Sequence, residues 1–286
     1  MDHRRGRVGD GMTGPAGLLG STAAVPAAVS VRGLRFAYPD GHVALDGVDL
    51  EIGGGERVAV LGPNGAGKST LVLHLNGILQ AQRGEVAIGG LPVVKRNLAD
   101  VRRRVGIVFQ DPDDQLFMPT VHDDVAFGPA QAGLRGAELA DRVGGALEAV
   151  GMGDRRDAAP HHLSFGQRRR VAIATVLATE PDVLVLDEPT ANLDPAARRE
   201  LTEVLASLEV TLVVVTHDLP YALETCGRAV VLDAGRIVAD GATAEVLGDA
   251  EMLAGHRLYL PLGFDPSATS LRRCQGQALR AACGRP

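Results

Sequence analysis

One glycine-rich segment, GPNGAGKST, constrains the fold of this 286-residue chain more than any other feature. It fits the phosphate-loop pattern G-x-x-x-x-G-K-[ST] at every specified position. The apolar run at residues 57–61 predicts a buried strand before the segment, and the residues after it have helical spacing. A strand, a glycine loop and a helix in this order predict an α/β fold with a parallel sheet. The helix is predicted from four apolar residues, Leu71, Leu73, Leu75 and Ile78.

The glycine loop has the chemistry of an anion-binding site. Its glycines leave backbone N–H groups free to point at a phosphate, and the positive end of the following helix points to the same place. We expect Lys68 to reach the β- and γ-phosphates of a nucleotide and the Ser69 hydroxyl to bind Mg²⁺. The alternative is a glycine-rich turn without a ligand, which the flanking strand and helix disfavour. The residues expected to hold the nucleotide are Gly62, Pro63, Asn64, Gly65, Ala66, Gly67, Lys68, Ser69 and Thr70.

Charge and cysteine content exclude several classes of protein. The formal net charge of −6 argues against a nucleic-acid partner, because phosphate contacts require clustered lysine and arginine. Two arginine runs, at residues 102–104 and 168–170, are predicted to be solvated faces. Cys226, Cys274 and Cys283 have neither disulfide-framework nor zinc spacing, which fits a reducing compartment. No uncharged apolar stretch has transmembrane length, so the chain is not predicted to cross a bilayer.

The two ends of the chain are predicted to lie outside the folded domain. Residues 1–28 are rich in Gly, Ala and Pro, which dilute the apolar stretch too much for a secretory signal peptide. A disordered extension, or a true start at Met12, is the preferred interpretation. Residues 263–286 are polar and rich in Arg and Ala, and we expect a tail there. The domain is therefore expected at residues 29–262.

The residues before the glycine loop predict an antiparallel β subdomain. Alternating apolar residues from 29 to 36 predict a strand, the Pro- and Gly-containing turn at 38–41 ends it, and residues 48–52 predict a second strand. Tyr38 lies in that turn, just upstream of the phosphate loop. Its ring could stack on adenine, although packing on a strand end is nearly as favoured by the sequence alone.

Polar residues end three later strands, where ligands are bound in open parallel sheets. Asp187 ends an almost purely apolar strand and is expected to hold Mg²⁺, while Glu188 could polarise an attacking water. The alternative is that the two acids only cap the next helix, but the Pro-Thr pair that follows them disfavours this interpretation. Gln110 and His217 end two other strands; a lone histidine is more often structural, but this position favours a catalytic role. The strands are predicted at residues 105–109, 183–187 and 211–216.

A helical insert is predicted inside the α/β chain, at about residues 111–165. Residues 120–162 are mostly helical in pattern, and one amphipathic face is formed by Leu139, Val143, Leu147 and Val150. After the last parallel strand, residues 229–240 predict a hairpin and residues 241–247 a short final helix. The expected fold class is thus an α/β phosphate-loop NTPase core with a parallel sheet, an N-terminal antiparallel β subdomain and an inserted helical subdomain.

Taken together, these residues resemble an ABC-type ATPase over residues 29–262. The likeness consists of the phosphate loop and six further motifs in the order of the family, which makes it specific. Beside the phosphate loop they are the adenine-stacking aromatic Tyr38, the Q-loop glutamine Gln110, the signature at Ser164–Gln167, the Walker-B pair Asp187 and Glu188, the D-loop at 192–194 and the switch histidine His217.

The resemblance implies ATP and Mg²⁺ as cofactors and a shared site. Ser69, Gln110 and Asp187 are expected to bind the metal ion, and Glu188, His217 and Gln110 to serve catalysis. In this family the phosphate loop of one subunit faces the signature of another, so a head-to-tail pair with a second copy or a close paralogue is implied. The partner's signature residues would then close over the γ-phosphate; they are Ser164, Gly166 and Gln167.

The signature departs from the usual Leu-Ser-Gly-Gly-Gln at one position, where Phe165 replaces the first glycine. If that position required a positive φ, a bulky side chain would be strained there. Ser164, Gly166 and the backbone amides remain, so signature function is expected to be kept.

A finer likeness is to the ATP-binding subunit of cobalt importers and the energy-coupling-factor group. It is carried by residues 36–41, 75–77, 109–117 and 119–129. It implies integral membrane transporter subunits as partners and a peripheral place on the cytoplasmic face of the cell membrane. Nickel, biotin or another vitamin are alternative cargoes. A chromosome-organising ATPase is disfavoured because no long coiled coil separates loop and signature, and a translation-type ATPase because the chain has one cassette.

Overall fold

A six-stranded, mainly parallel sheet forms the centre of the structure, a computed structural model that describes residues 28–267. The strand order is β10-β9-β3-β8-β7-β6, and within this sheet only β10 is antiparallel to its neighbour. β3, β7 and β8 are runs of mostly Val and Leu with side chains buried on both faces, as expected of strands covered on both sides. The strands are β3 (Arg57–Leu61), β6 (Val105–Val108), β7 (Val183–Asp187), β8 (Thr211–Val215), β9 (Arg228–Asp233) and β10 (Arg236–Ala242).

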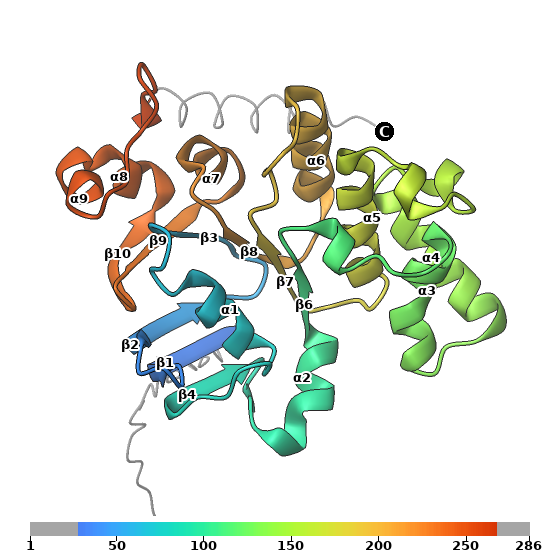
Figure 1. The fold of residues 1–286 in the computed structure, drawn as a ribbon, viewed down its shortest axis with the longest axis horizontal. Coiled ribbons are helices and arrows are strands. Elements are labelled where there is room, and N and C mark those ends of the chain that lie inside the picture. The colour runs from blue at the N-terminus through green and yellow to red at the C-terminus, as the bar shows by residue number, and fades with distance from the viewer. Residues whose placement is uncertain (1–27, 268–286) are drawn as a thin grey trace, which may run out of the picture.

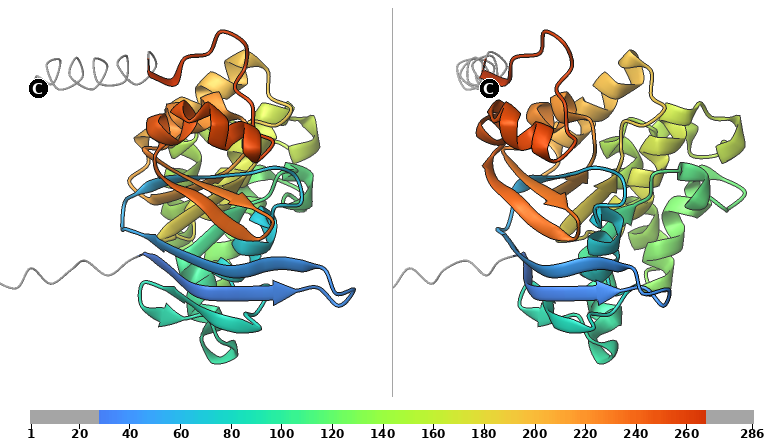
Figure 2. Two further views of the ribbon diagram at one scale, coloured as in Figure 1. Left: turned by 90° about the vertical axis from the view of Figure 1, so that its left-hand side faces the viewer. Right: turned by 60° about the vertical axis from the view of Figure 1, so that its left-hand side comes forward.

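A smaller antiparallel sheet of order β2-β1-β4-β5 packs beside the large one, in blue and teal in Figure 1 and Figure 2. Helix α1 (Lys68–Leu75) contributes Leu71, Val72 and Leu75 to a core that also contains apolar residues of both sheets. The glycine loop before α1 is therefore fixed where the two sheets meet. The strands of the small sheet are β1 (Val29–Ala37), β2 (Val43–Ile52), β4 (Arg83–Ile88) and β5 (Leu91–Pro92).

Three helices between β6 and β7 form the side of the molecule drawn in green and yellow in Figure 1. Val143, Leu147 and Val150 are buried as the amphipathic pattern predicts, and Leu139 is partly buried against the same core. The three helices are α3 (Val121–Gln131), α4 (Gly136–Ala149) and α5 (Phe165–Leu177). With the parallel core and the antiparallel N-terminal sheet, they confirm the predicted fold class.

Two predictions on helix ends are wrong. α1 ends at Leu75, so Ile78 lies beyond it and is 49% exposed. The predicted final helix is α8, and a further helix, α9, follows because the Asp249 side chain accepts a hydrogen bond from the Met252 N–H and starts a new N-terminus. The remaining helices are α2 (Leu98–Arg104), α6 (Pro195–Ser207), α7 (Leu219–Thr225), α8 (Thr243–Gly248) and α9 (Ala250–Gly255).

The two arginine runs behave differently. Arg102 and Arg103 are exposed at the end of α2, as predicted. The run at residues 168–170 is not a solvated face, because Arg169 is 0% exposed and the other two are largely covered. Each of its three guanidinium groups reaches another segment of the chain, which a periodicity argument does not detect.

None of the helices within residues 28–267 combines the length and the apolarity needed to cross a bilayer. The predicted extension at 1–28 lies outside the described residues except for residue 28, and the predicted tail lies outside them from residue 268 onward. Cys274 and Cys283 are also outside, while Cys226 is buried at the end of α7.

Candidate functional site

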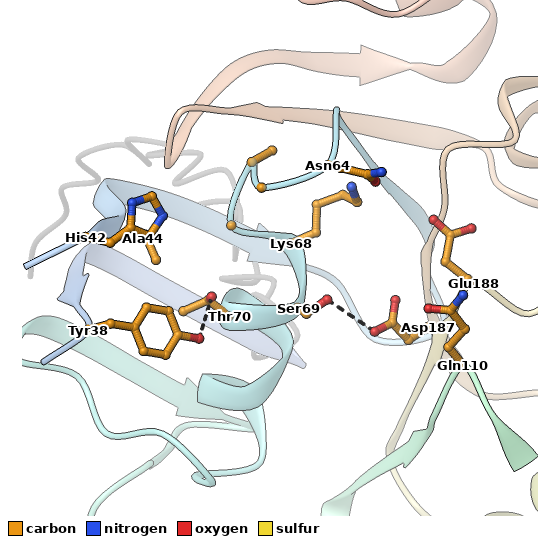
Figure 3. A pocket seen from close by; sticks show the side chains of 13 residues that line it. Tyr38, His42, Ala44, Asn64, Lys68, Ser69, Thr70, Gln110, Asp187 and Glu188 are labelled. Atoms are coloured by element: carbon orange, nitrogen blue, oxygen red, sulfur yellow. Dashed lines mark hydrogen bonds between the residues drawn. The ribbon is translucent and has the colours of Figure 1, made fainter. Parts of the chain in front are cut away.

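A cavity of about 290 Å³ lies over the glycine loop, at the carboxyl ends of the central strands. Figure 3 shows Tyr38 and His42 at one end of it, Gln110 and Glu188 at the other, and Lys68 between them. The structure thus brings together residues that the sequence predicts from four separate segments. The lining residues are Tyr38, His42, Ala44, Asn64, Gly65, Ala66, Gly67, Lys68, Ser69, Thr70, Gln110, Asp187 and Glu188.

The loop can form only with glycine at two positions. Gly62 has φ 149° and a Cβ there would lie 2.0 Å from the Leu232 carbonyl oxygen; Gly67 has φ 105° and a Cβ there would lie 2.4 Å from the Ala44 carbonyl oxygen. Gly67 is also the N-cap of α1, and no side chain caps this helix. The first turn of α1 therefore presents its N–H groups to the cavity, which suits an anion.

Lys68 supplies the positive charge of the cavity. Its Nζ donates to the carbonyl oxygens of Gly62 and Pro63 at 2.8 and 3.0 Å. Burial lowers the pKa of the Lys68 ammonium, and the negative charges of Glu188 and Asp187 oppose that shift. A partly desolvated ammonium beside a ring of amides attracts a polyanion more strongly than a hydrated one would.

Ser69 and Asp187 form a pair of oxygen donors at the start of α1 and the end of β7. The Ser69 hydroxyl donates to Asp187 Oδ2 at 3.3 Å (Figure 3). Burial raises the pKa of Asp187, as does the charge of Glu188, while the Ser69 hydrogen bond, Lys68 and Arg169 lower it. Hydroxyl, carboxylate and the nearby Gln110 amide are hard oxygen donors. They fit Mg²⁺, which needs few protein ligands when phosphates complete its shell.

Glu188 is held by the strand beside it. Its backbone lies in the left-handed region with φ 45°, an uncommon conformation for a residue other than glycine, and its N–H donates to Val215 O at 2.8 Å. Thr216 donates its hydroxyl to Oε2 at 3.0 Å. Oε1 accepts from the His217 N–H at 3.1 Å and contacts the imidazole Nδ1 at 2.7 Å. The carboxylate is only 12% exposed and lines the cavity together with Asp187.

His217 does not line this cavity. Its side chain is 68% exposed and reaches the site only through Glu188. The structure therefore places the predicted switch histidine behind the predicted base.

The ring of Tyr38 both packs on the end of a strand and lines the cavity. The hydroxyl is 3.1 Å from Thr70 Oγ1, and the ring packs edge-to-face on Phe36 with centroids 5.1 Å apart, yet it also lines the cavity. His42 and Ala44 line the cavity too and were missed from the sequence. His42 is brought there by the closure of the turn at 38–41, in which the Tyr38 N–H donates to His42 O at 2.9 Å.

The signature residues Ser164, Gly166 and Gln167 lie apart from this cavity. Ser164 Oγ accepts from the Gln167 N–H at 3.2 Å and Gln167 Oε1 from the Ser164 N–H at 2.9 Å, a capping box that starts α5. Phe165 is in the first turn of α5 and has no positive φ, so the expected strain is absent. Gly166 is the tight position, since a Cβ there would lie 2.8 Å from Ala197 Cβ.

Known proteins resemble this chain in sequence and in fold. The family model described as ABC transporter matches residues 45–191. A putative ABC transporter ATP-binding protein of Streptomyces coelicolor is 66% identical over 255 residues, covering 89% of this chain and 97% of that protein. The energy-coupling factor transporter ATP-binding protein EcfA of Carboxydothermus hydrogenoformans is 51% identical over 238 residues, covering 82% and 88%.

A solved structure is also similar: cbiO1 from Clostridium perfringens, described as part of the ABC transporter complex cbiONQ. It has a TM-score of 0.73 and 38% identity, and the match covers 87% of this chain and 99% of that one. Family model, relatives and structure agree with the resemblance seen in the motifs. The chain therefore belongs to the ABC transporter family, as an ATP-binding and ATP-hydrolysing subunit.

Proposed function

We propose that two copies of this chain pair head to tail and hold each ATP between the glycine loop of one copy and the signature edge of the other. The observation that carries this proposal is the separation of the two halves. The cavity gathers Lys68, Ser69, Asp187 and Glu188, whereas Ser164 and Gly166 of the same chain lie outside it. A second copy would supply them, and each pair would contain two such sites.

Within the site, the amides of the loop and Lys68 bind the β- and γ-phosphates. Ser69, Gln110 and Asp187 would hold Mg²⁺, which when bound supplies charge neutralisation for the transferred phosphoryl group. Oε1 of Glu188 already accepts from the His217 N–H and contacts its ring, so the free acceptor capacity is on Oε2, beside the Thr216 hydroxyl. Glu188 would orient a water through Oε2, and catalysis is positioning and electrostatic stabilisation.

The cargo proposal is an importer of the energy-coupling type, with cobalt as the first candidate. Its support is the names of the relatives, EcfA and cbiO1, together with the sequence likeness around residues 109–129. Phe117 and Phe127 in this stretch are 66% and 40% exposed and stack edge-to-face at 5.2 Å. We propose that the chain lies on the cytoplasmic face of the membrane, bound to integral membrane subunits. Nickel, biotin or another vitamin remain the alternative cargoes.

Substitution of Glu188 tests the catalytic proposal. Glu188→Gln should lower kcat for ATP by on the order of 10²-fold or more while ATP binding persists, because a neutral amide cannot act as a base. Glu203→Gln is the matched control, since Glu203 is 70% exposed on α6. Unchanged turnover in Glu188→Gln would remove Glu188 from this role.

Co-purification in mild detergent tests the transport proposal. The tagged chain should retain integral membrane proteins, and ATP-dependent uptake of radioactive cobalt into cells should require Lys68. Competition by nickel or biotin would identify the alternative cargo. Recovery of ribosomes or DNA in place of membrane proteins would contradict the assignment.

A further inference from the structure

Arg169 is a buried charge that the site described above leaves unexplained. It is 0% exposed and is one of the largest fully buried side chains among the described residues. No carboxylate within those residues forms an ion pair with it. Burial lowers the pKa of its guanidinium, and the charges of Asp111 and Asp187 oppose that shift. A buried cation without an ion-pair partner is costly, so the hydrogen bonds that it makes have to offset that cost.

The contacts of Arg169 are two consecutive carbonyl groups of the segment that carries Gln110. Nη1 donates to Phe109 O at 2.7 Å, and Nη2 donates to Gln110 O. A guanidinium is rigid and planar, so two parallel donors fix the orientation of both peptide groups at once. A lysine in this position would keep the positive charge but could not donate to both carbonyl groups in the same fixed geometry.

The Phe165 ring also packs on the Arg169 guanidinium. Its ring lies 5.4 Å from Arg169 Cζ and 5.7 Å from Arg168 Cζ. A cation over an aromatic face is stabilised most where water is excluded. Phe165, which replaces the first glycine of the usual signature, therefore packs an aromatic ring on the Arg169 guanidinium. A glycine at this position could not make that contact.

Two further contacts connect the same segments. Arg168 Nε pairs with Asp113 Oδ1 at 2.9 Å. Gln115 donates through Nε2 to Ala172 O at 2.8 Å and to Thr175 Oγ1 at 2.7 Å, and its Oε1 accepts from the Phe109 N–H at 3.3 Å. Helix α5 and residues 109–115 are thus joined at three places, and Arg169 is the most buried of the side chains that join them.

We infer that Arg169 is a positioning residue that holds the main chain at Gln110 and ties it to the signature helix. Because α5 begins directly after Ser164, a displacement of Gln110 would also displace the signature residues Ser164 and Gly166. A displacement of these signature residues would likewise displace Gln110. In the dimer proposed above, these signature residues contact the ATP that is held by the other copy. Arg169 then couples the two nucleotide sites of a pair. This coupling rests on the proposed function, whereas the positioning of residues 109–115 by Arg169 does not.

Hydrogen–deuterium exchange of Arg169→Lys against the unaltered full chain tests the hold directly. Amides in this segment are protected by bonds within it, such as Gln115 N–H and Leu116 N–H to Pro112 O at 3.1 and 3.0 Å. We expect exchange in residues 109–116 to become several-fold faster and that of the β3 and β8 strands to stay unchanged. Arg170→Lys is the matched control, because Arg170 pairs with Glu200 on α6. Unaltered exchange at 109–116 in Arg169→Lys would overturn the inference.

A double-mutant cycle tests whether Arg169 acts through Gln110. Arg169→Lys alone should lower kcat by about tenfold with KM changed less, while Arg170→Lys stays within about twofold. In a Gln110→Ala background the same Arg169→Lys change should have less than about a twofold effect. Effects that multiply would contradict positioning through Gln110.

Two outcomes separate this inference from the proposed function. If Gln110→Ala alone retains full turnover, the role of Gln110 in the proposed function is wrong, and the exchange data still decide the hold by Arg169. If Arg169→Lys does not fold, Phe165→Leu replaces it, since Phe165 is half-buried and its loss uncovers the guanidinium. Faster exchange at 109–116 would support the inference, and unchanged exchange would overturn it.

Discussion

The glycine loop and the signature segment are both glycine-containing turns that begin a helix, yet their N-termini differ. At α1 the N-cap is Gly67 and no side chain caps the helix, so its amides face the cavity. At α5 the N-terminus is closed by the capping box of Ser164 and Gln167. The loop is prepared to bind an anion by itself, whereas at the signature the N–H groups of Ser164 and Gln167 are already bonded within the capping box.

The difference indicates that the glycine-loop half binds the nucleotide and that the signature half completes the site of another chain. The loop half should set the affinity for the nucleotide within one chain. The signature half should contribute only when a second chain is present, because it lies outside the cavity of its own chain. The predictions that follow break or sharpen this contrast, beginning with the largest effect.

Lys68→Ala should break the binding half. We expect ATP binding to weaken and turnover to fall by on the order of 10²- to 10³-fold, because the cavity loses its cation. Isothermal titration and steady-state ATPase assays measure the two effects. Lys95→Ala is the control, since Lys95 is the only other lysine in the sequence and is exposed. Unchanged affinity in Lys68→Ala would show that the amides alone bind the phosphates.

Ser164→Ala should break the completing half and spare the binding half. Turnover should fall about 10- to 100-fold while ATP affinity of the single chain stays within about twofold, since a hydrogen bond to a charged group is lost only in the pair. Thr120→Ala removes a comparable N-cap from α3, whose Thr120 Oγ1 accepts from the Asp123 N–H at 3.1 Å. An equal loss of turnover in Thr120→Ala would mean that only helix capping was lost.

Tyr38 should tune affinity at the far end of the cavity. Tyr38→Ala should weaken ATP binding by about tenfold through loss of a stacking face. Tyr38→Phe keeps the ring and loses only the contact with Thr70 at 3.1 Å, so its effect should stay within about twofold. Fluorescent-nucleotide titration compares both. Equal affinities of all three proteins would assign Tyr38 to packing on Phe36.

Asp187→Asn should have the smallest effect, a gain in stability of the nucleotide-free protein. Burial and Glu188 raise the pKa of Asp187, so the native state binds a proton more readily than the unfolded chain. This group's contribution to stability is therefore greatest at low pH and is lost as pH rises through its native pKa. Asp187→Asn should raise Tm at pH 7 more than at pH 4, with exposed Asp141→Asn as control. A lower Tm at pH 7 would contradict this account.

Local patterns predicted most of the fold and of the cavity. Val- and Leu-rich strands such as β7, and the loop at Gly62–Thr70, are fixed by short-range chemistry, so their places followed from the residues. His42 was missed because its position depends on how a turn closes, and Arg169 because its partners are about 60 residues away along the chain. Contacts between distant segments are not visible in periodicity, and the positive φ of Glu188 is likewise set by tertiary structure.

The central claim is that each bound ATP is held between two chains. The mass of the Glu188→Gln variant in solution tests this claim most directly. Size-exclusion chromatography with light scattering should give the mass of one chain without nucleotide and twice that mass with Mg-ATP. Addition of Ser164→Ala to the same chain should return the mass toward one chain. A Glu188→Gln protein that binds Mg-ATP and stays at the mass of one chain would contradict the account.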